Sequence, residues 1–132
     1  MRTRSVLTAL GASVALTLGA ASGAGADVGP AAPFEDCKRG YICVYTGLNG
    51  TGVMQKWLGD DPNWLDGDKQ FHGRVRSICN HGTEDPNNLE TVLFYFQTNY
   101  RSYYASAGKD WCGNTQSDGS SVKLRSHKWV KA

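Results

Sequence analysis

Tyr45-Thr46-Gly47-Leu48-Asn49-Gly50-Thr51-Gly52 and, fifty residues later, Tyr95-Phe96-Gln97-Thr98-Asn99-Tyr100-Arg101-Ser102 are the two stretches that decide the fold. In each, an apolar run ends in an aromatic residue, crosses a turn that contains asparagine, and continues as a second run. A repeat of this period indicates two similar supersecondary units, neither of which is large enough to bury its own apolar face. The sequence therefore predicts two related β-units that pack against each other.

The remaining sequence consists of short apolar or alternating runs separated by turns. The chain contains 16 glycines, and no segment has the apolar period of a long amphipathic helix. This pattern predicts an all-β protein of two Greek-key units, with halves at 37–84 and 85–132. The polar segment 59–73 is expected to fold over Trp64, Leu65 and Phe71. The expected strands are 41–45, 53–58, 75–79, 91–96, 103–106 and 121–125.

The first 26 residues have the composition of a signal peptide. Arg2 and Arg4 precede the uncharged apolar stretch 6–18, and Ala24-Gly25-Ala26 has the small residues of a cleavage site. The apolar stretch is shorter than the roughly 20 residues that a membrane span needs. We therefore expect cleavage after Ala26, a secreted, extracellular chain that begins with an extended leader (27–36), and no membrane association.

Charge gives little support for a nucleic-acid partner. The chain has 14 basic and 12 acidic residues, and loss of Arg2 and Arg4 with the signal leaves 12 of each. A balanced charge disfavours nucleic-acid binding. The C-terminal cations are expected to lie on the solvent face of the last strand and on a frayed end, or alternatively to contact an anionic wall polymer or the acidic rim of a partner. This basic tail contains Lys123, Arg125, His127, Lys128, Trp129 and Lys131.

All four cysteines lie after the signal. An even number in a small exported protein indicates disulfides rather than metal ligands or catalytic thiols. The sequence favours Cys37–Cys43, because the short segment between them contains glycine and can close locally, together with Cys79–Cys112. The other two pairings stay open. In the chain-entropy model the favoured bridges stabilise the fold by roughly 2 and 4 kcal/mol.

No motif for catalysis is present. Glu84, His81 and Arg74 are residue types that serve in acid–base sites, but their spacing is not specific. Phosphate loops, zinc-protease motifs and nucleophile elbows are absent from the sequence. We therefore expect no enzyme activity, no catalytic residue and no cofactor. Four tyrosines are expected in core and corner packing rather than in carbohydrate stacking, namely Tyr95, Tyr100, Tyr103 and Tyr104.

The run from Cys37 to Gly47 has the pattern Cys-x-x-Gly-x-x-Cys-x-Tyr-x-Gly. It resembles the disulfide-closed start of the secreted metalloproteinase inhibitors of Streptomyces, whose fold is similar to a βγ-crystallin domain. Ser77 stands where these proteins carry a serine-bearing strand. The resemblance implies a βγ-crystallin-like sandwich of two Greek-key units stapled by two disulfides. It also implies a peptidase inhibitor, most of all of metalloproteases, whose partner is an extracellular protease. Separately, we expect a monomer.

The chain departs from that family at two places. The family's second disulfide closes a short reactive loop, whereas Cys79 and Cys112 lie 33 positions apart, so no reactive site is transferred. The crystallin calcium motif needs paired Asn or Asp residues before the serine. Alignment on Ser77 supplies none, and alignment on Ser120 and Ser121 supplies Gln116 and Ser117. We therefore expect no metal site.

Turn composition alone places the candidate inhibitory loop at 80–90, directly after Cys79, with 108–119 as the next candidate. The loop would enter the protease cleft while the Cys79–Cys112 bridge tethers it. The alternative function is a non-catalytic crystallin-like binding module, or a small toxin, that acts on cell-wall or extracellular ligands. The candidate residues of the inhibitory loop are His81, Thr83, Glu84, Asp85 and Pro86.

Overall fold

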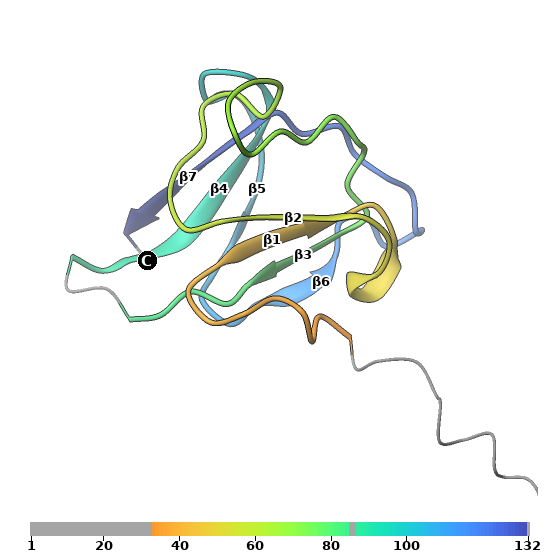
Figure 1. Ribbon diagram of the computed structural model, residues 1–132, viewed down its shortest axis with the longest axis horizontal. Coiled ribbons are helices and arrows are strands. Elements are labelled where there is room, and N and C mark those ends of the chain that lie inside the picture. The colour runs from red at the N-terminus through yellow and green to blue at the C-terminus, as the bar shows by residue number, and fades with distance from the viewer. Residues whose placement is uncertain (1–32, 85–86, 132) are drawn as a thin grey trace, which may run out of the picture. The chain divides into compact units, whose positions relative to one another are not determined.

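Both copies of the repeated stretch fold as antiparallel hairpins, as predicted. The computed structural model describes residues 33–84 and 87–131, all within one compact unit, 32–132 (Figure 1). In the first hairpin, β1 (Ile42–Tyr45) pairs with β2 (Met54–Trp57) across the short helical turn η3 (Leu48–Gly50). In the second, β4 (Leu89–Gln97) pairs with β5 (Arg101–Ala107).

Asparagine occupies the equivalent position in both turns. The φ angles of Asn49 and Asn99 are 55° and 60°. Asparagine enters this left-handed region more readily than most residues with a side chain. The repeated asparagine therefore has the same backbone role in both hairpins.

A serine ties each hairpin turn to a neighbouring strand. In both halves the buried serine Oγ donates to a carbonyl before the turn and accepts a backbone N–H within it. Ser77 Oγ donates to the Gly47 carbonyl (2.7 Å) and accepts from Gly50 N–H (2.9 Å). Ser126 Oγ donates to the Gln97 carbonyl (2.6 Å) and accepts from Tyr100 N–H (3.1 Å). The counterpart of Ser77 in the second half is therefore Ser126, and the alignment on Ser120 and Ser121 was wrong.

The strands form two antiparallel sheets, which confirms the all-β class. Sheet A has the order β2-β1-β3-β6, and sheet B has the order β5-β4-β7. The added strands are β3 (Ser77–Asn80), β6 (Cys112–Asn114) and β7 (Ser126–Lys131). In each sheet a later strand returns beside the first strand of the hairpin, β3 beside β1 and β7 beside β4, as in Greek-key connections. β6 comes from the second half of the sequence but pairs with β3.

Apolar side chains of both sheets share one core. Trp64, from the connection between β2 and β3, is fully buried and stacks on Trp57, with ring centroids 4.8 Å apart. Phe71 is also buried, as predicted, but Leu65 is exposed because only its neighbour Trp64 reaches the core. The other core residues are Ile42, Val44, Val75, Ile78, Val92, Phe94, Ala107, Val122 and Leu124.

The C-terminal segment differs from the prediction. The strand expected at 121–125 lies at 126–131, and 121–125 contributes only an isolated bridge between Val122 and Val75. The expected frayed end is also wrong, because β7 pairs with β4 and places His127 opposite Phe94. Alternation at 121–125 reflects burial of Val122 and Leu124 in an extended connection. A period of two cannot distinguish such a connection from a paired strand.

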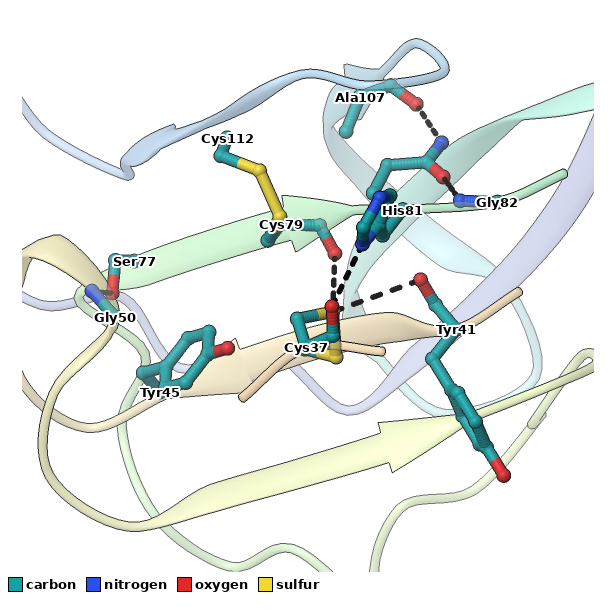
Figure 2. Close-up of a disulfide and its surroundings, with 12 residues drawn as sticks. Cys37, Tyr41, Tyr45, Gly50, Ser77, Cys79, His81, Gly82, Ala107 and Cys112 are labelled. Carbon is teal, nitrogen blue, oxygen red and sulfur yellow. Dashed lines mark hydrogen bonds between the residues drawn. A yellow bond between two sulfur atoms is a disulfide. The ribbon is translucent and has the colours of Figure 1, made fainter. Parts of the chain in front are cut away.

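The disulfides are Cys37–Cys43 and Cys79–Cys112, which confirms the favoured pairing. Cys43, Cys79 and Cys112 stand opposite one another on the neighbouring strands β1, β3 and β6. Both bridges therefore lie on the same part of sheet A (Figure 2). The buried cysteines Cys37, Cys43 and Cys79 form a second, smaller apolar cluster with Tyr45, Phe34, Tyr41 and Met54.

Candidate functional site

The base of the predicted inhibitory loop is fixed by one buried asparagine. Asn80 ends β3, and its Nδ2 donates to the carbonyl oxygens of Glu90 (3.0 Å) and Ala107 (2.9 Å). Its Oδ1 accepts the backbone N–H of Gly82 at 2.9 Å (Figure 2). A single side chain thus joins the first arm of the β3–β4 loop (81–88), through Gly82, to the start of β4 and to the end of β5. The geometry limits the conformations open to the residues that the loop presents.

The first arm of the β3–β4 loop is also tied to the N-terminal disulfide. His81 Nδ1 lies 2.7 Å from the Cys37 carbonyl, which can only accept, so Nδ1 carries the hydrogen (Figure 2). The His81 backbone accepts from Gly40 N–H (2.6 Å) and donates to the Tyr41 carbonyl (2.9 Å). His81 therefore serves as an anchor of the loop, and its ring is already engaged.

The other predicted loop residues fall into two groups. Thr83 and Glu84 are exposed next to this anchored base. Glu84 forms a salt bridge of 3.5 Å with Lys109, which links the β3–β4 loop to the second candidate loop, 108–119. Such an exposed ion pair contributes little to stability. Asp85 and Pro86 lie outside the described residues.

A cleft of about 360 Å³ opens beside Thr83, and sequence reasoning missed it. Leu58 is 66% exposed at its edge, and Leu89 and Trp129 also line it. Leu58 directly follows β2, Leu89 begins β4 and Trp129 lies within β7, so no local signal unites them. Gly82 is required here, since a Cβ at this position would lie 2.8 Å from Trp129 Cη2. The remaining lining residues are Gly40, Gly59 and Asp60.

Trp129 combines an apolar ring surface with an indole N–H that has no hydrogen-bond partner among the described residues. Its backbone N–H donates to Asp60 Oδ1 at 2.8 Å, which fixes the strand end beside the cleft. Its indole Nε1 is buried without a hydrogen-bond partner within the described part of the chain. Tryptophan side chains of this kind are common where one protein binds another.

Two of the three histidines have structural roles. His81 is held by Cys37, and His127 is buried in the aromatic core, 4.8 Å from Trp57 by ring centroids. Among residues 33–84 and 87–131, no group of three or more His, Cys, Asp or Glu side chains is arranged to hold a metal ion. Within the same residues no helix is long and apolar enough to span a membrane.

The tyrosines divide between two environments. Tyr104 packs against the main core, in line with the packing interpretation, and burial raises its pKa. Tyr95 lies within ring contact of Tyr100 (5.7 Å) and Tyr103 (6.1 Å), and Tyr103 is exposed. Core packing therefore does not extend to Tyr103.

Two antiparallel sheets with Greek-key connections and serine-tied hairpins define a βγ-crystallin-like fold. A solved structure described as "Evolution of the eye lens beta-gamma-crystallin domain fold" is similar over 71% of this chain and 88% of its own, with a TM-score of 0.54. Its sequence identity is 12%, so this likeness shows the fold alone. None of the curated proteins matches the chain.

The model of peptidase inhibitor family I36 matches residues 30–107. The chain belongs to this family, which is that of the Streptomyces metalloproteinase inhibitors. It is therefore a non-enzymatic protein of the inhibitor class, and its partner is a peptidase. The matched residues include the first hairpin, Cys37, Cys43, Cys79 and the β3–β4 loop, and they end before Cys112.

Proposed function

We propose that the protein is exported and blocks a zinc-dependent peptidase by placing the β3–β4 loop in its active-site cleft. The observation that carries this proposal is the hydrogen bonding of Asn80 to Gly82 in the loop and to Glu90 at the start of β4, which fixes the base of the loop. A loop held in this way loses little conformational entropy when it binds. In a zinc peptidase, a carbonyl or side-chain oxygen near Thr83 or Glu84 would approach the open coordination position of the metal.

The first test is a titration of the purified, oxidised protein against a thermolysin-like zinc peptidase, with a subtilisin-type serine peptidase in parallel. We expect stoichiometric loss of the zinc enzyme's activity alone. Inhibition of the serine enzyme alone would contradict the proposed target class. No inhibition of either enzyme would favour the alternative, a crystallin-like binding module without inhibitory activity.

A loop variant tests the proposed contact. Thr83→Gly with Glu84→Ser removes the exposed side chains without touching Asn80, so the inhibition constant should rise at least about tenfold. The control pair, Asp68→Ser with Lys69→Gly, changes two exposed residues of the 59–73 segment and should leave inhibition unchanged. Equal inhibition by both variants would place the contact elsewhere.

The cleft beside Thr83 provides a second, independent test of the same interface. Leu58→Ser should weaken inhibition several-fold, because an exposed leucine beside the loop would be buried by a bound peptidase. Val53→Ser is a matched control, since Val53 directly precedes β2 and is 67% exposed, and Leu58 directly follows β2 and is 66% exposed. Inhibition assays on both variants, with circular dichroism to compare folding, distinguish interface loss from misfolding. A larger effect of Val53→Ser would move the interface to the opposite end of β2.

Export is tested on the protein recovered from culture medium. Intact mass spectrometry should give a chain that begins at Asp27 and contains two disulfides. Retention of residues 1–26 on the secreted chain, or recovery of the protein from the cells alone, would contradict this part of the proposal.

A further inference from the structure

A second cleft, of about 510 Å³, lies at the end of β4 opposite to the β3–β4 loop. Its lining combines three cationic side chains with two exposed apolar ones, and it contains no acidic residue. Within the described residues, the only salt bridge joins Lys109 to Glu84, so none of the three cations is paired with a carboxylate. The lining residues are Leu65, Phe96, Gln97, Thr98, Arg101, Lys123 and Arg125.

Arg125 is the most informative residue of this cleft. It is 8% exposed, and its guanidinium donates to the carbonyl oxygens of His72 (3.1 Å), Gly73 (3.2 Å) and Leu124 (2.6 Å). These carbonyls hold the group in place but supply no negative charge. Burial and the neighbouring Arg74 lower the pKa of Arg125. A buried cation without a counter-charge is unfavourable, and an anion in the cleft would relieve this.

The internal repeat provides a comparison for Arg125. Arg125 and Arg76 each directly precede the serine that ties a hairpin turn. The backbone N–H of Arg125 donates to the Tyr95 carbonyl (2.9 Å), and that of Arg76 donates to the carbonyl of the equivalent Tyr45 (2.8 Å). Arg76 is exposed, whereas Arg125 is buried. The buried arginine is therefore a property of the second half rather than a requirement of the repeat.

The apolar part of the lining is positioned as well. Leu65 is 39% exposed and Phe96 is 41% exposed, both large fractions for side chains of this size. The backbone N–H of Leu65 donates to Asn63 Oδ1 at 2.9 Å, and this hydrogen bond fixes the backbone at Leu65. Arg101 Nε donates to the Thr98 carbonyl at 3.2 Å, which orients that cation. The cleft thus offers two oriented arginines and an exposed lysine beside an apolar surface.

We propose that this cleft binds an organic carboxylate that carries an apolar or aromatic group. The carboxylate contacts Arg101, Lys123 and Arg125, since guanidinium groups match its geometry. The apolar group lies against Leu65 and Phe96. Two sources share this chemistry, a small free acid and the carboxyl terminus of a peptide with an apolar last residue. The site is separate from the proposed inhibitory loop, so it does not depend on inhibition.

The test is an NMR titration of the full, oxidised, ¹⁵N-labelled protein. The probes are 3-phenylpropionate, its uncharged amide, and acetyl-Ala-Ala-Phe with a free carboxyl group, each up to about 10 mM. We expect the two acids to shift amides at 96–101 and 123–125, with a Kd at least about tenfold below that of the amide. Tighter binding of the tripeptide would identify a peptide terminus as the source, and equal binding would identify a small acid; both support the proposal.

Charge variants complete the test. R101Q with K123Q removes two exposed cations and should raise the Kd of 3-phenylpropionate about tenfold. K38Q with R39Q makes the same charge change at exposed positions outside the cleft and should have no effect. Equal binding of acid and amide would overturn the proposal, as would retained binding in R101Q/K123Q. Inorganic phosphate that binds as tightly as 3-phenylpropionate would also overturn it, because this would show general anion attraction.

Discussion

At the scale of single residues, His127 is the buried titratable group that links the core to solution pH. Its Nε2 lies 2.7 Å from the Gly59 carbonyl, which can only accept, so Nε2 carries the hydrogen. Its Nδ1 therefore accepts from Trp64 Nε1 at 3.0 Å. A second proton on the ring would point at that indole N–H. Burial lowers the pKa of His127 from 6.5 to about 4, although the Gly59 bond and Asp60 oppose the shift.

This pKa shift predicts a loss of stability in mild acid. The unfolded chain binds the proton below about pH 6.5, and the folded chain binds it only near pH 4, so stability falls as pH decreases through this window. The full loss is on the order of 3 kcal/mol. Urea unfolding between pH 7 and 4 measures it. His127→Gln should be less stable at neutral pH but should lose this slope, whereas exposed His72→Gln should keep it. If stability still falls with pH in His127→Gln, the pH dependence arises from carboxylates instead.

The sequence identified the residue types of the loop site but not their roles. His81 and Glu84 were selected from turn composition, and the structure shows His81 to be an anchor and Glu84 to be exposed. Asn80 was not selected, because an asparagine at a strand end commonly marks a turn. Its three hydrogen bonds reach Gly82, Glu90 and Ala107, and the last two lie far along the chain.

At the scale of elements, the two serines explain how short strands hold their hairpins. Ser126 Oγ connects β7 to both sides of the β4–β5 turn, as Ser77 connects β3 to the β1–β2 turn. Each serine satisfies one backbone carbonyl and one backbone N–H. Turn and strand therefore stabilise each other, although they are distant in sequence.

Ser126→Ala tests this element. The substitution leaves a carbonyl and an N–H unsatisfied, so we expect a loss of about 2 kcal/mol in the free energy of unfolding. Ser77→Ala should cost a similar amount, because it removes the equivalent contacts. Ser117→Ala, at an exposed position, is the control and should change stability little. Chemical denaturation of the three variants measures the differences, and a neutral Ser126→Ala would show that water replaces the lost bonds.

At the scale of the whole molecule, the two disulfides constrain the chain over different lengths. Cys37–Cys43 closes a separation of 6 residues, and Cys79–Cys112 closes one of 33. The longer bridge also joins β3 to β6, a strand of three residues from the other half of the sequence. We therefore expect it to contribute more to the cohesion of sheet A than the shorter bridge.

Paired alanine variants test this order. Cys79→Ala with Cys112→Ala should lower the free energy of unfolding by about 4 kcal/mol, and Cys37→Ala with Cys43→Ala by about 2 kcal/mol. Alanine avoids placing a hydroxyl group in the buried cysteine cluster. Thermal and urea unfolding measure both effects. A larger loss for the shorter bridge would show that native packing around Cys37 outweighs chain entropy.

The sequence by itself determined the all-β class, the two hairpins and the resemblance to the family, and it favoured the disulfide pairing that the structure confirms. These features depend on local patterns, namely the alternation of apolar and polar residues, turn residues and the positions of cysteines. Most of these patterns can be recognised within a few neighbouring residues. Only the tertiary structure decided that 126–131 is a paired strand, that His127 is buried, and that Leu58, Leu89 and Trp129 share a cleft. Those outcomes depend on strand pairing and burial between segments distant in the chain, and a local pattern carries no information about which distant segment it will meet.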